Sequence, residues 1–254
     1  MRGRPNLYID YRKESSIFSN NTQKGWFGIL ITLSIAFCFL ATDYWILLLT
    51  TSFLIAIAGW GLNIVSGLAG QINLAHGVFI GVGTYASAVI GGVATSSVIG
   101  FELDMIFWLP FAGIAAAIVG LIIAPITVKL KGLNLALVTL ALVFIGSHLF
   151  SNFKSVTGGA GLGRKVATLK LFGVNLEKGI EIGTLYFQKN QILYLFCLLT
   201  CILAGLGFKN LVRSRAGRAY SAIRDGDIAA EALGINLFRH KASAFALSSF
   251  YGGI

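Results

Sequence analysis

Residues 44–101, YWILLLTTSFLIAIAGWGLNIVSGLAGQINLAHGVFIGVGTYASAVIGGVATSSVIGF, contain no Asp, Glu, Lys or Arg over 58 positions. A helix needs about 20 mostly apolar residues to cross the roughly 30 Å hydrocarbon core of a bilayer, so the stretch is long enough for two crossings with a break between them. Helices on the surface of a soluble protein carry a charged outer face, which this stretch lacks. It therefore predicts helices that span a membrane.

The rest of the chain has the same apolar character. It is 56% hydrophobic and 12% charged, whereas an ordinary soluble domain carries roughly 25% charged residues. We predict an all-α fold, a polytopic membrane helical bundle with glycine-interrupted helices. The expected spans, within a transmembrane domain over residues 25–254, are residues 25–42, 44–60, 74–92, 106–128, 133–151, 190–208 and 242 onward.

The basic residues predict an orientation. Five Lys or Arg lie in residues 1–24, two at 129 and 131, seven in 209–241 and six in 152–190. Short cytoplasmic loops are enriched in Lys and Arg, so we place the N-terminal segment 1–24 and the region 209–241 in the cytoplasm and the loop 152–189 outside. The first apolar run is longer than the core of a cleavable signal, so we expect a retained helix. Only thirteen residues follow Lys241, too few for a span, so we expect a C-terminally truncated sequence.

Several classes of function are disfavoured. The net charge of +10 comes from residues between spans, not from a basic domain, so we expect no nucleic-acid partner. The three cysteines lie in apolar runs without a His or carboxylate beside them, so we expect no metal or other cofactor. No expected span has a charged residue at its core, which disfavours an ion-coupled or proton-coupled carrier. No acid–base or nucleophile set is present, so we do not expect an enzyme.

Polar residues and glycines interrupt the apolar pattern within residues 59–92. Irregular backbone at membrane depth is tolerated where it is buried in protein or lines a cavity. This segment is therefore a candidate lining for the path of a small polar solute. The alternative is that the glycines allow close helix packing and the amides link helices. The candidate residues are Asn63, Gly67, Gly70, Gln71, Asn73 and His76.

A second unusual stretch is SRAGRAYSAIRDGDIAAEALGINLFRHKASAF, residues 214–245. A single helix over 219–234 would place small and apolar side chains on one side and charged ones on the others. Gly234 would then end the helix in a left-handed turn. Physical reasoning leaves two uses open: docking of a partner protein, or a helix lying on anionic lipid headgroups.

Part of this stretch resembles the cytoplasmic coupling region of ABC importer permeases, which carries the signature E-A-A-x-x-x-G. Ala229, Ala230 and Gly234 match it, while Ile228 stands in the place of the Glu and Asp227 precedes it. The stretch as a whole, together with GLNIVSGLAGQINLAHGVFIGVGTYASA, KGLNLALVTLAL and VTGGAGLG, is similar to the permeases of branched-chain (hydrophobic) amino-acid importers. The resemblance covers most of residues 55–250.

The resemblance implies a permease in a bacterial inner membrane, with two cytoplasmic ATP-binding subunits, a second homologous permease subunit and a periplasmic substrate-binding protein as partners, besides membrane lipid. It implies an ATPase-coupling site that Ala229, Ala230 and Gly234 match, and we assign the flanking charged residues Arg218, Arg224, Asp227 and Glu231 to the same site. The transported solute would be a branched-chain or other hydrophobic amino acid. Urea or a short-chain amide is the alternative, and an ion-coupled secondary carrier is the further one.

Overall fold

The computed structural model describes residues 21–95, 98–130, 132–159, 163–171, 174–176, 179–182 and 185–254. Most of the predicted N-terminal segment 1–24 lies outside these ranges. The helices are α2 (Asn21–Leu40), α3 (Asp43–Asn63), the π-helix η1 (Ile64–Leu68), α4 (His76–Gly91), α5 (Met105–Lys129), α6 (Leu133–Asn152), α7 (Lys154–Thr157), α8 (Lys189–Arg213), α9 (Arg215–Asp225), α10 (Asp227–Ala232) and α11 (Leu237–Gly253). The predicted all-α, polytopic bundle is confirmed.

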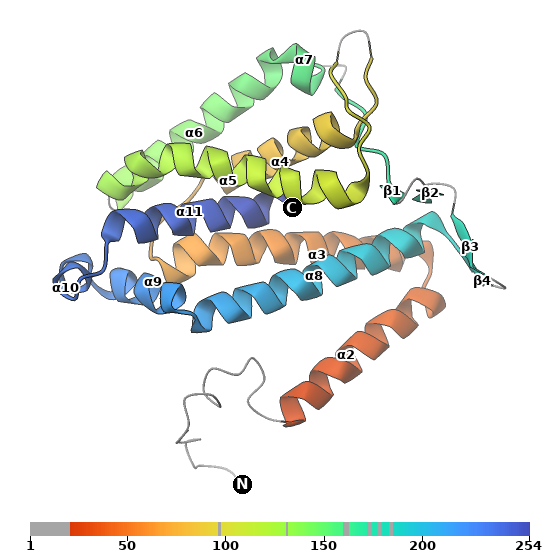
Figure 1. Cartoon of the computed structure of the whole chain (residues 1–254), viewed down its shortest axis with the longest axis horizontal. Helices are drawn as coiled ribbons and strands as arrows, with labels where there is room; N and C mark the ends of the chain where they lie inside the picture. The colour runs from red at the N-terminus through yellow and green to blue at the C-terminus, as the bar shows by residue number, and fades with distance from the viewer. Residues whose placement is uncertain are drawn as a thin grey trace.

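Strands occur only as short hairpins in the described part of the loop between α7 and α8. Strand β1 (Lys170–Leu171) pairs with β2 (Val174–Asn175), and β3 (Ile180–Ile182) pairs with β4 (Leu185–Phe187), both antiparallel. Each ladder has two strands. The hairpins lie at one end of the bundle and add nothing to its core (Figure 1).

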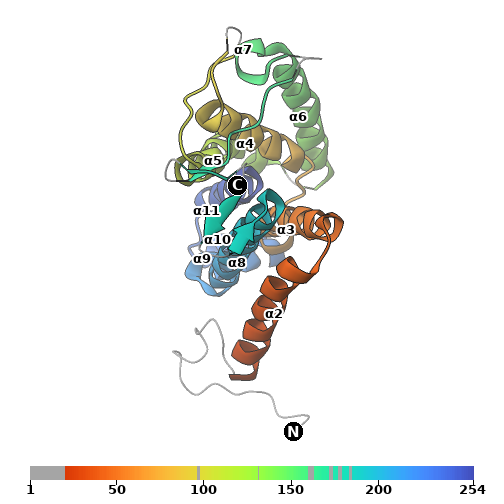
Figure 2. The same ribbon diagram turned by 90° about the vertical axis from the view of Figure 1, so that its right-hand side faces the viewer.

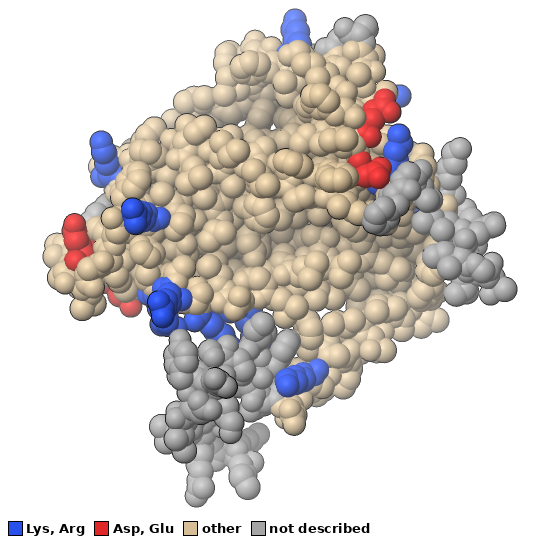
Figure 3. Space-filling view, viewed as in Figure 1, with Lys and Arg blue, Asp and Glu red and all other residues tan. Residues whose placement is uncertain are grey.

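Five helical segments are long and apolar enough to cross a membrane: α2, α3 with η1, α5, α6 and α8. Their outward surfaces carry many large apolar side chains, such as Leu40, Ile122 and Phe144. A protein with such a large exposed apolar surface would aggregate in water, whereas in a bilayer this surface contacts lipid chains. On the face shown in Figure 3, charged side chains gather over α9 and α10 and over the strand-bearing end, and the broad middle of the bundle between them is uncharged.

Helix α11 lies at the centre of the bundle. It packs against α5, α4, α3 and η1, and it runs between α5 and α3 in Figure 1. Helix α8 packs along α3, while α2 stands to one side and contacts α8 (Figures 1 and 2).

Small residues allow α11 to approach its neighbours closely. A Cβ atom on Gly83 of α4 would overlap the backbone of Gly253, and one on Gly120 of α5 would overlap the side chain of Ser249. Helices in lipid gain little from the hydrophobic effect, so close contact between small residues is a main source of their association. Both residues that lie close to these glycines, Gly253 and Ser249, belong to α11.

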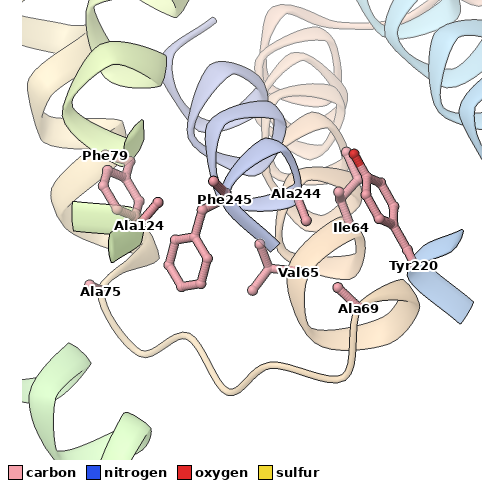
Figure 4. Packing of buried hydrophobic residues seen from close by; sticks show 10 residues of the cluster. Ile64, Val65, Ala69, Ala75, Phe79, Ala124, Tyr220, Ala244 and Phe245 are labelled. Carbon is pink, nitrogen blue, oxygen red and sulfur yellow. The ribbon is translucent and has the colours of Figure 1, made fainter. Parts of the chain in front are cut away.

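The main hydrophobic cluster lies where η1, α4, α5, α9 and α11 meet. Phe245 lies in its middle next to Val65 of η1, with Phe79 and Ala124 on one side and Ile64 on the other (Figure 4). Tyr220 brings the amphipathic α9 into the same cluster. The bundle core therefore continues into the region that the sequence assigned to the cytoplasm.

Two expected boundaries were wrong. The single helix expected over 219–234 is two helices, because Gly226, with φ 178° and ψ 111°, separates α9 from α10. The last helix begins at Leu237 rather than 242, because Asn236 caps it by accepting a hydrogen bond from the backbone N–H of Arg239 at 3.0 Å.

Candidate functional site

The connection between η1 and α4, residues 69–75, is extended and alternates in burial. Gln71 and Asn73 are buried, while Ile72 and Leu74 between them are exposed. In a strand at the surface of a soluble protein, the polar side chains would face the solvent and the apolar ones the interior. Polar side chains inside and apolar ones outside are the arrangement expected where lipid surrounds the chain and a polar path lies within it.

Hydrogen bonds hold this connection in place. The backbone N–H of Gln71 donates to the carbonyl of Val65 at 3.0 Å. The N–H of Leu74 donates to Thr139 Oγ1 on α6 at 3.2 Å, and the N–H of Ala75 donates to Asn73 Oδ1 at 3.0 Å. Gly70 has φ +65°, a left-handed conformation that favours glycine. The chain can therefore leave η1 and start α4 without unpaired main-chain groups at these positions. That glycines are the cause of the interruption stays a prediction.

His76, the first residue of α4, links that helix to α3. Its Nε2 lies 2.9 Å from the carbonyl oxygen of Ala58. The ring also lies against Gly61 and Gly252, where an added Cβ would be 3.2 Å from its Cε1. His76 thus packs between α3 and α11.

Polar atoms without partners gather along the same segment. Among the described residues, Gln71 Nε2 and Oε1, Asn73 Nδ2 and His76 Nδ1 are buried and have no hydrogen-bond partner. Unsatisfied buried polar groups are rare in folded proteins because each costs about 1–3 kcal/mol. A polar solute that passes along this segment would supply the missing hydrogen bonds.

Asn63 and Gly67 do not join this group. Asn63 is exposed on the last turn of α3, and its Oδ1 occupies the space that a Cβ of Gly67 would need. The carbonyl oxygen of Gly67 instead accepts a hydrogen bond from α9, since Arg224 Nη1 donates to it at 3.1 Å. The Arg224 side chain also covers Gly70, where an added Cβ would lie 2.7 Å from Arg224 Cγ. Helix α9 is therefore fastened directly to the polar connection.

A buried ion pair joins α10 to α11. Lys241 Nζ lies 2.9 Å from Asp227 Oδ2, and the Lys241 side chain is only 4% exposed. The sequence analysis missed Lys241. The signal that could have found it was a lone Lys next to the apolar run of the last helix, with acidic residues on the preceding amphipathic stretch.

A hydroxyl pair joins α9 to α11. The hydroxyls of Tyr220 and Ser243 share a hydrogen bond of 2.8 Å. Burial raises the pKa of the Tyr220 phenol, and the hydrogen bond from Ser243 opposes this shift. The phenol remains protonated at neutral pH, so the link between the helices persists there.

Helix α10 presents apolar side chains to its surroundings. Ile228 is 84% exposed and Leu233 is 79% exposed, whereas Ala230 is 1% exposed. The helix ends as the sequence predicts: Gly234 has φ +82°, and the N–H groups of Gly234 and Ile235 donate to the carbonyls of Glu231 and Ala230 at 2.9 and 3.0 Å. This is the hydrogen-bond pattern of a Schellman motif. Any partner meets Ile228 and Leu233 before it meets Ala230.

One cavity borders the connection, and another lies beside the residues that His76 contacts. The first, of about 490 Å³, is lined by Gly70 and Gln71 and by Arg224, Asp227 and Ala229. The second, of about 380 Å³, lies among α3, α4, α5 and α11 and reaches Ala58 and Gly252, the neighbours of His76. The candidate path residues Gly70 and Gln71 therefore line the same cavity as the candidate coupling residues Arg224, Asp227 and Ala229. Arg218 stands apart, because its Nη1 donates to the carbonyl of Arg213 at 3.0 Å.

The fold and this site define a multi-pass membrane protein with a polar interior. Residues 44–254 match the family described as "Branched-chain amino acid transport system / permease component". The chain belongs to this family.

Two relatives carry the description "High-affinity branched-chain amino acid transport system permease protein LivM". One is from Escherichia coli (strain K12) and the other from Salmonella typhimurium, and each is 29% identical over 245 residues, 91% of this chain. The chain spans 56% of the length of each relative. No solved structure matches the chain.

Proposed function

We propose that the chain is the permease subunit of an ATP-driven importer of branched-chain or other hydrophobic amino acids in a bacterial inner membrane, with its N-terminus in the cytoplasm. Membership of the permease family and the name of the LivM relatives support the substrate class. The observation that carries the proposal is the hydrogen bond from Arg224 to the carbonyl of Gly67, because it joins the amphipathic helix α9 to η1, directly before the polar connection.

The partners are two cytoplasmic ATP-binding subunits, a second homologous permease subunit and a periplasmic substrate-binding protein. Helices α9 and α10 form the docking element for an ATP-binding subunit. Hydrogen bonds and ion pairs tie this element to η1 and α11, so a movement imposed on it reaches the bundle interior. Rigid-body movement of packed helices is a common way to alternate access to a site.

The path itself runs along residues 70–76. Gln71, Asn73 and His76 present polar atoms that lack partners among the described residues, and a cavity of about 490 Å³ borders Gly70 and Gln71. In this proposal the energy for uphill movement comes from the partner ATP-binding subunits.

Uptake into proteoliposomes tests the proposal. The chain is reconstituted with a second permease, ATP-binding subunits and a binding protein of the same system, with ATP enclosed and labelled solute outside. We expect uptake of leucine, isoleucine or valine that requires ATP, the binding protein and both permeases. ATP-dependent uptake of urea or acetamide instead would favour the short-amide alternative. Uptake driven by an ion gradient without the ATPases would overturn the proposal.

A further inference from the structure

The 490 Å³ cavity is built from segments that lie far apart in the sequence. The polar connection supplies Gln71, the turn between α5 and α6 leads to Leu135, and α9 to α11 supply the charged residues Arg224, Asp227 and Lys241. It borders the docking helix α10 on one side and the polar connection on the other, so a molecule bound there touches both.

The cavity contains a buried pair of opposite charges. Asp227 and Lys241 are joined at 2.9 Å, with side chains that are 13% and 4% exposed. Taking one partner away from a buried pair is costly because the remaining charge is uncompensated. A ligand with a single charge would pair with one of these residues and leave the charge of the other uncompensated. A zwitterion can instead pair its carboxylate with Lys241 and its ammonium group with Asp227.

A second, independent feature points to a ligand. Gln71 lines the cavity and is only 5% exposed, yet neither of its side-chain polar atoms has a hydrogen-bond partner within the described residues. An amide group can donate to a carboxylate and accept from an ammonium group. Gln71 therefore completes a set of groups that suits both ends of an amino acid.

The remaining wall is apolar. Leu135, Ile223 and Ile228 line the cavity beside the charged groups. An aliphatic side chain of the ligand would remove part of this surface from water, which is favourable by roughly 25 cal/mol per Å². The cavity thus selects for a zwitterion with an apolar side chain.

We propose that this cavity is a cytoplasmic binding site for a hydrophobic α-amino acid, separate from the outer cavity near His76. The inference rests on the proposed function in that the ligand is the imported product. Because the bound amino acid bridges Asp227 of α10 and Gln71 of the connection, it holds the docking element against the bundle. Accumulated product therefore slows ATP-driven uptake from the cytoplasmic side.

Direct binding tests the site without the transport partners. The purified chain in detergent is titrated with radiolabelled L-leucine, and leucinamide, which lacks the carboxylate, and 4-methylpentanoate, which lacks the ammonium group, are used as competitors. We expect leucine to bind and each analogue to compete roughly tenfold or more weakly, since each loses a charge-assisted hydrogen bond. Equal competition by either analogue would overturn the zwitterion site.

Variants locate the site. Gln71→Leu keeps the shape and leaves the ion pair intact, so we expect it to fold and to bind leucine about tenfold more weakly. Glu231→Gln is the matched control, because Glu231 lies nearby on α10, is exposed and is not among the residues that line the cavity. Unchanged binding by Gln71→Leu would refute the proposal. Loss of binding only on Thr84→Val in the second cavity would refute it as well.

The two proposals fail separately. If the reconstituted importer carries another solute, the claim that the ligand is the imported product fails, while leucine binding to the isolated chain with the expected pattern still establishes the cavity as an amino-acid site. Conversely, ATP-dependent leucine uptake that internal leucine does not slow, with no leucine binding by the isolated chain, overturns the site and leaves the permease role untouched.

Discussion

Gly70 is the residue at which the polar connection and helix α9 meet. Its φ of +65° is one that L residues with a side chain adopt at a cost of about 1–2 kcal/mol. The Arg224 side chain also fills the space beside it. Backbone conformation and close contact therefore both require glycine at this position.

Gly70→Ala is accordingly expected to lower the thermal unfolding temperature in detergent and to reduce ATP-dependent uptake. The added Cβ would lie 2.7 Å from Arg224 Cγ, so Arg224 has to move away from the carbonyl of Gly67. Gly77→Ala is the control, because it lies in α4 with nothing within 4 Å of an added Cβ. A Gly70→Ala protein as stable as the Gly77→Ala protein would contradict this account.

Lys241 and Asp227 form a buried ion pair, so each charge compensates the other. Removing one partner of a buried pair typically costs about 3–5 kcal/mol, while removing both is far less costly. We expect Lys241→Met to lower the unfolding temperature strongly and Lys241→Met/Asp227→Asn to recover part of the loss. Strictly additive effects in this double-mutant cycle would show that the pair contributes no coupling.

At the scale of elements, α10 is a short helix whose inner and outer sides have different uses. Ala230 is buried, so a bulky residue there would disturb the packing of α10 on its own chain. Ile228 and Leu233 are exposed, so they are the side chains that can enter a groove of an ATP-binding subunit.

Replacing these two exposed residues tests the docking role. Ile228→Asp and Leu233→Asp are expected to reduce recovery of the ATP-binding subunit in a pull-down by about tenfold or more, because each buries a carboxylate in an apolar contact. Insertion of the chain in the membrane should be unaffected. Ile228→Val and Leu233→Met keep the apolar contact and serve as controls. Full recovery with the Asp variants would exclude docking through α10.

Helices α4 and α11 can contact each other closely because Gly83 and Gly253 have no side chains. Gly83→Leu is expected to separate the two helices, since even a Cβ would overlap the backbone of Gly253. Size-exclusion chromatography in detergent should show an aggregated or expanded protein. Gly77→Leu lies in the same helix in open space and should elute as the unchanged chain does. Identical profiles for both variants would contradict the packing.

For the whole molecule, the orientation is the prediction on which the docking proposal depends. A chain with Cys38, Cys197 and Cys201 replaced by Ser receives one new cysteine, either Glu231→Cys in α10 or Glu102→Cys at the opposite end. An impermeant maleimide applied to intact cells should label Glu102→Cys, and Glu231→Cys only after the cells are opened. Labelling of Glu231→Cys on intact cells would place α10 outside.

The sequence predicts where the five membrane-length helices lie, but not which helices contact one another. Long charge-free runs located the five membrane-length helices, because the thickness of a bilayer fixes how many apolar residues a span needs. The turn at Gly234 followed from local chemistry. The break at Gly226 was missed, since a glycine inside an amphipathic pattern is compatible with a continuous helix.

The site was predicted in two separate parts. Gln71 and Asn73 stood out as polar residues in an apolar run, and Asp227 and Ala229 through their spacing. That Gln71, Asp227 and Ala229 line one cavity together with Lys241 depends on tertiary packing over more than 150 positions of sequence. Local patterns carry no information on such pairings.

The central place of α11 has a consequence for how the protein is made. Helices α3, α4 and α5 leave the ribosome long before residues 237–253 exist, yet α11 packs against all three. Until it arrives, the glycine-lined faces of α4 and α5 have no neighbour from α11 to cover them. Biogenesis must therefore keep a half-made bundle loosely assembled in the bilayer, and a nascent polypeptide that stops before residue 237 is a substrate for membrane proteases.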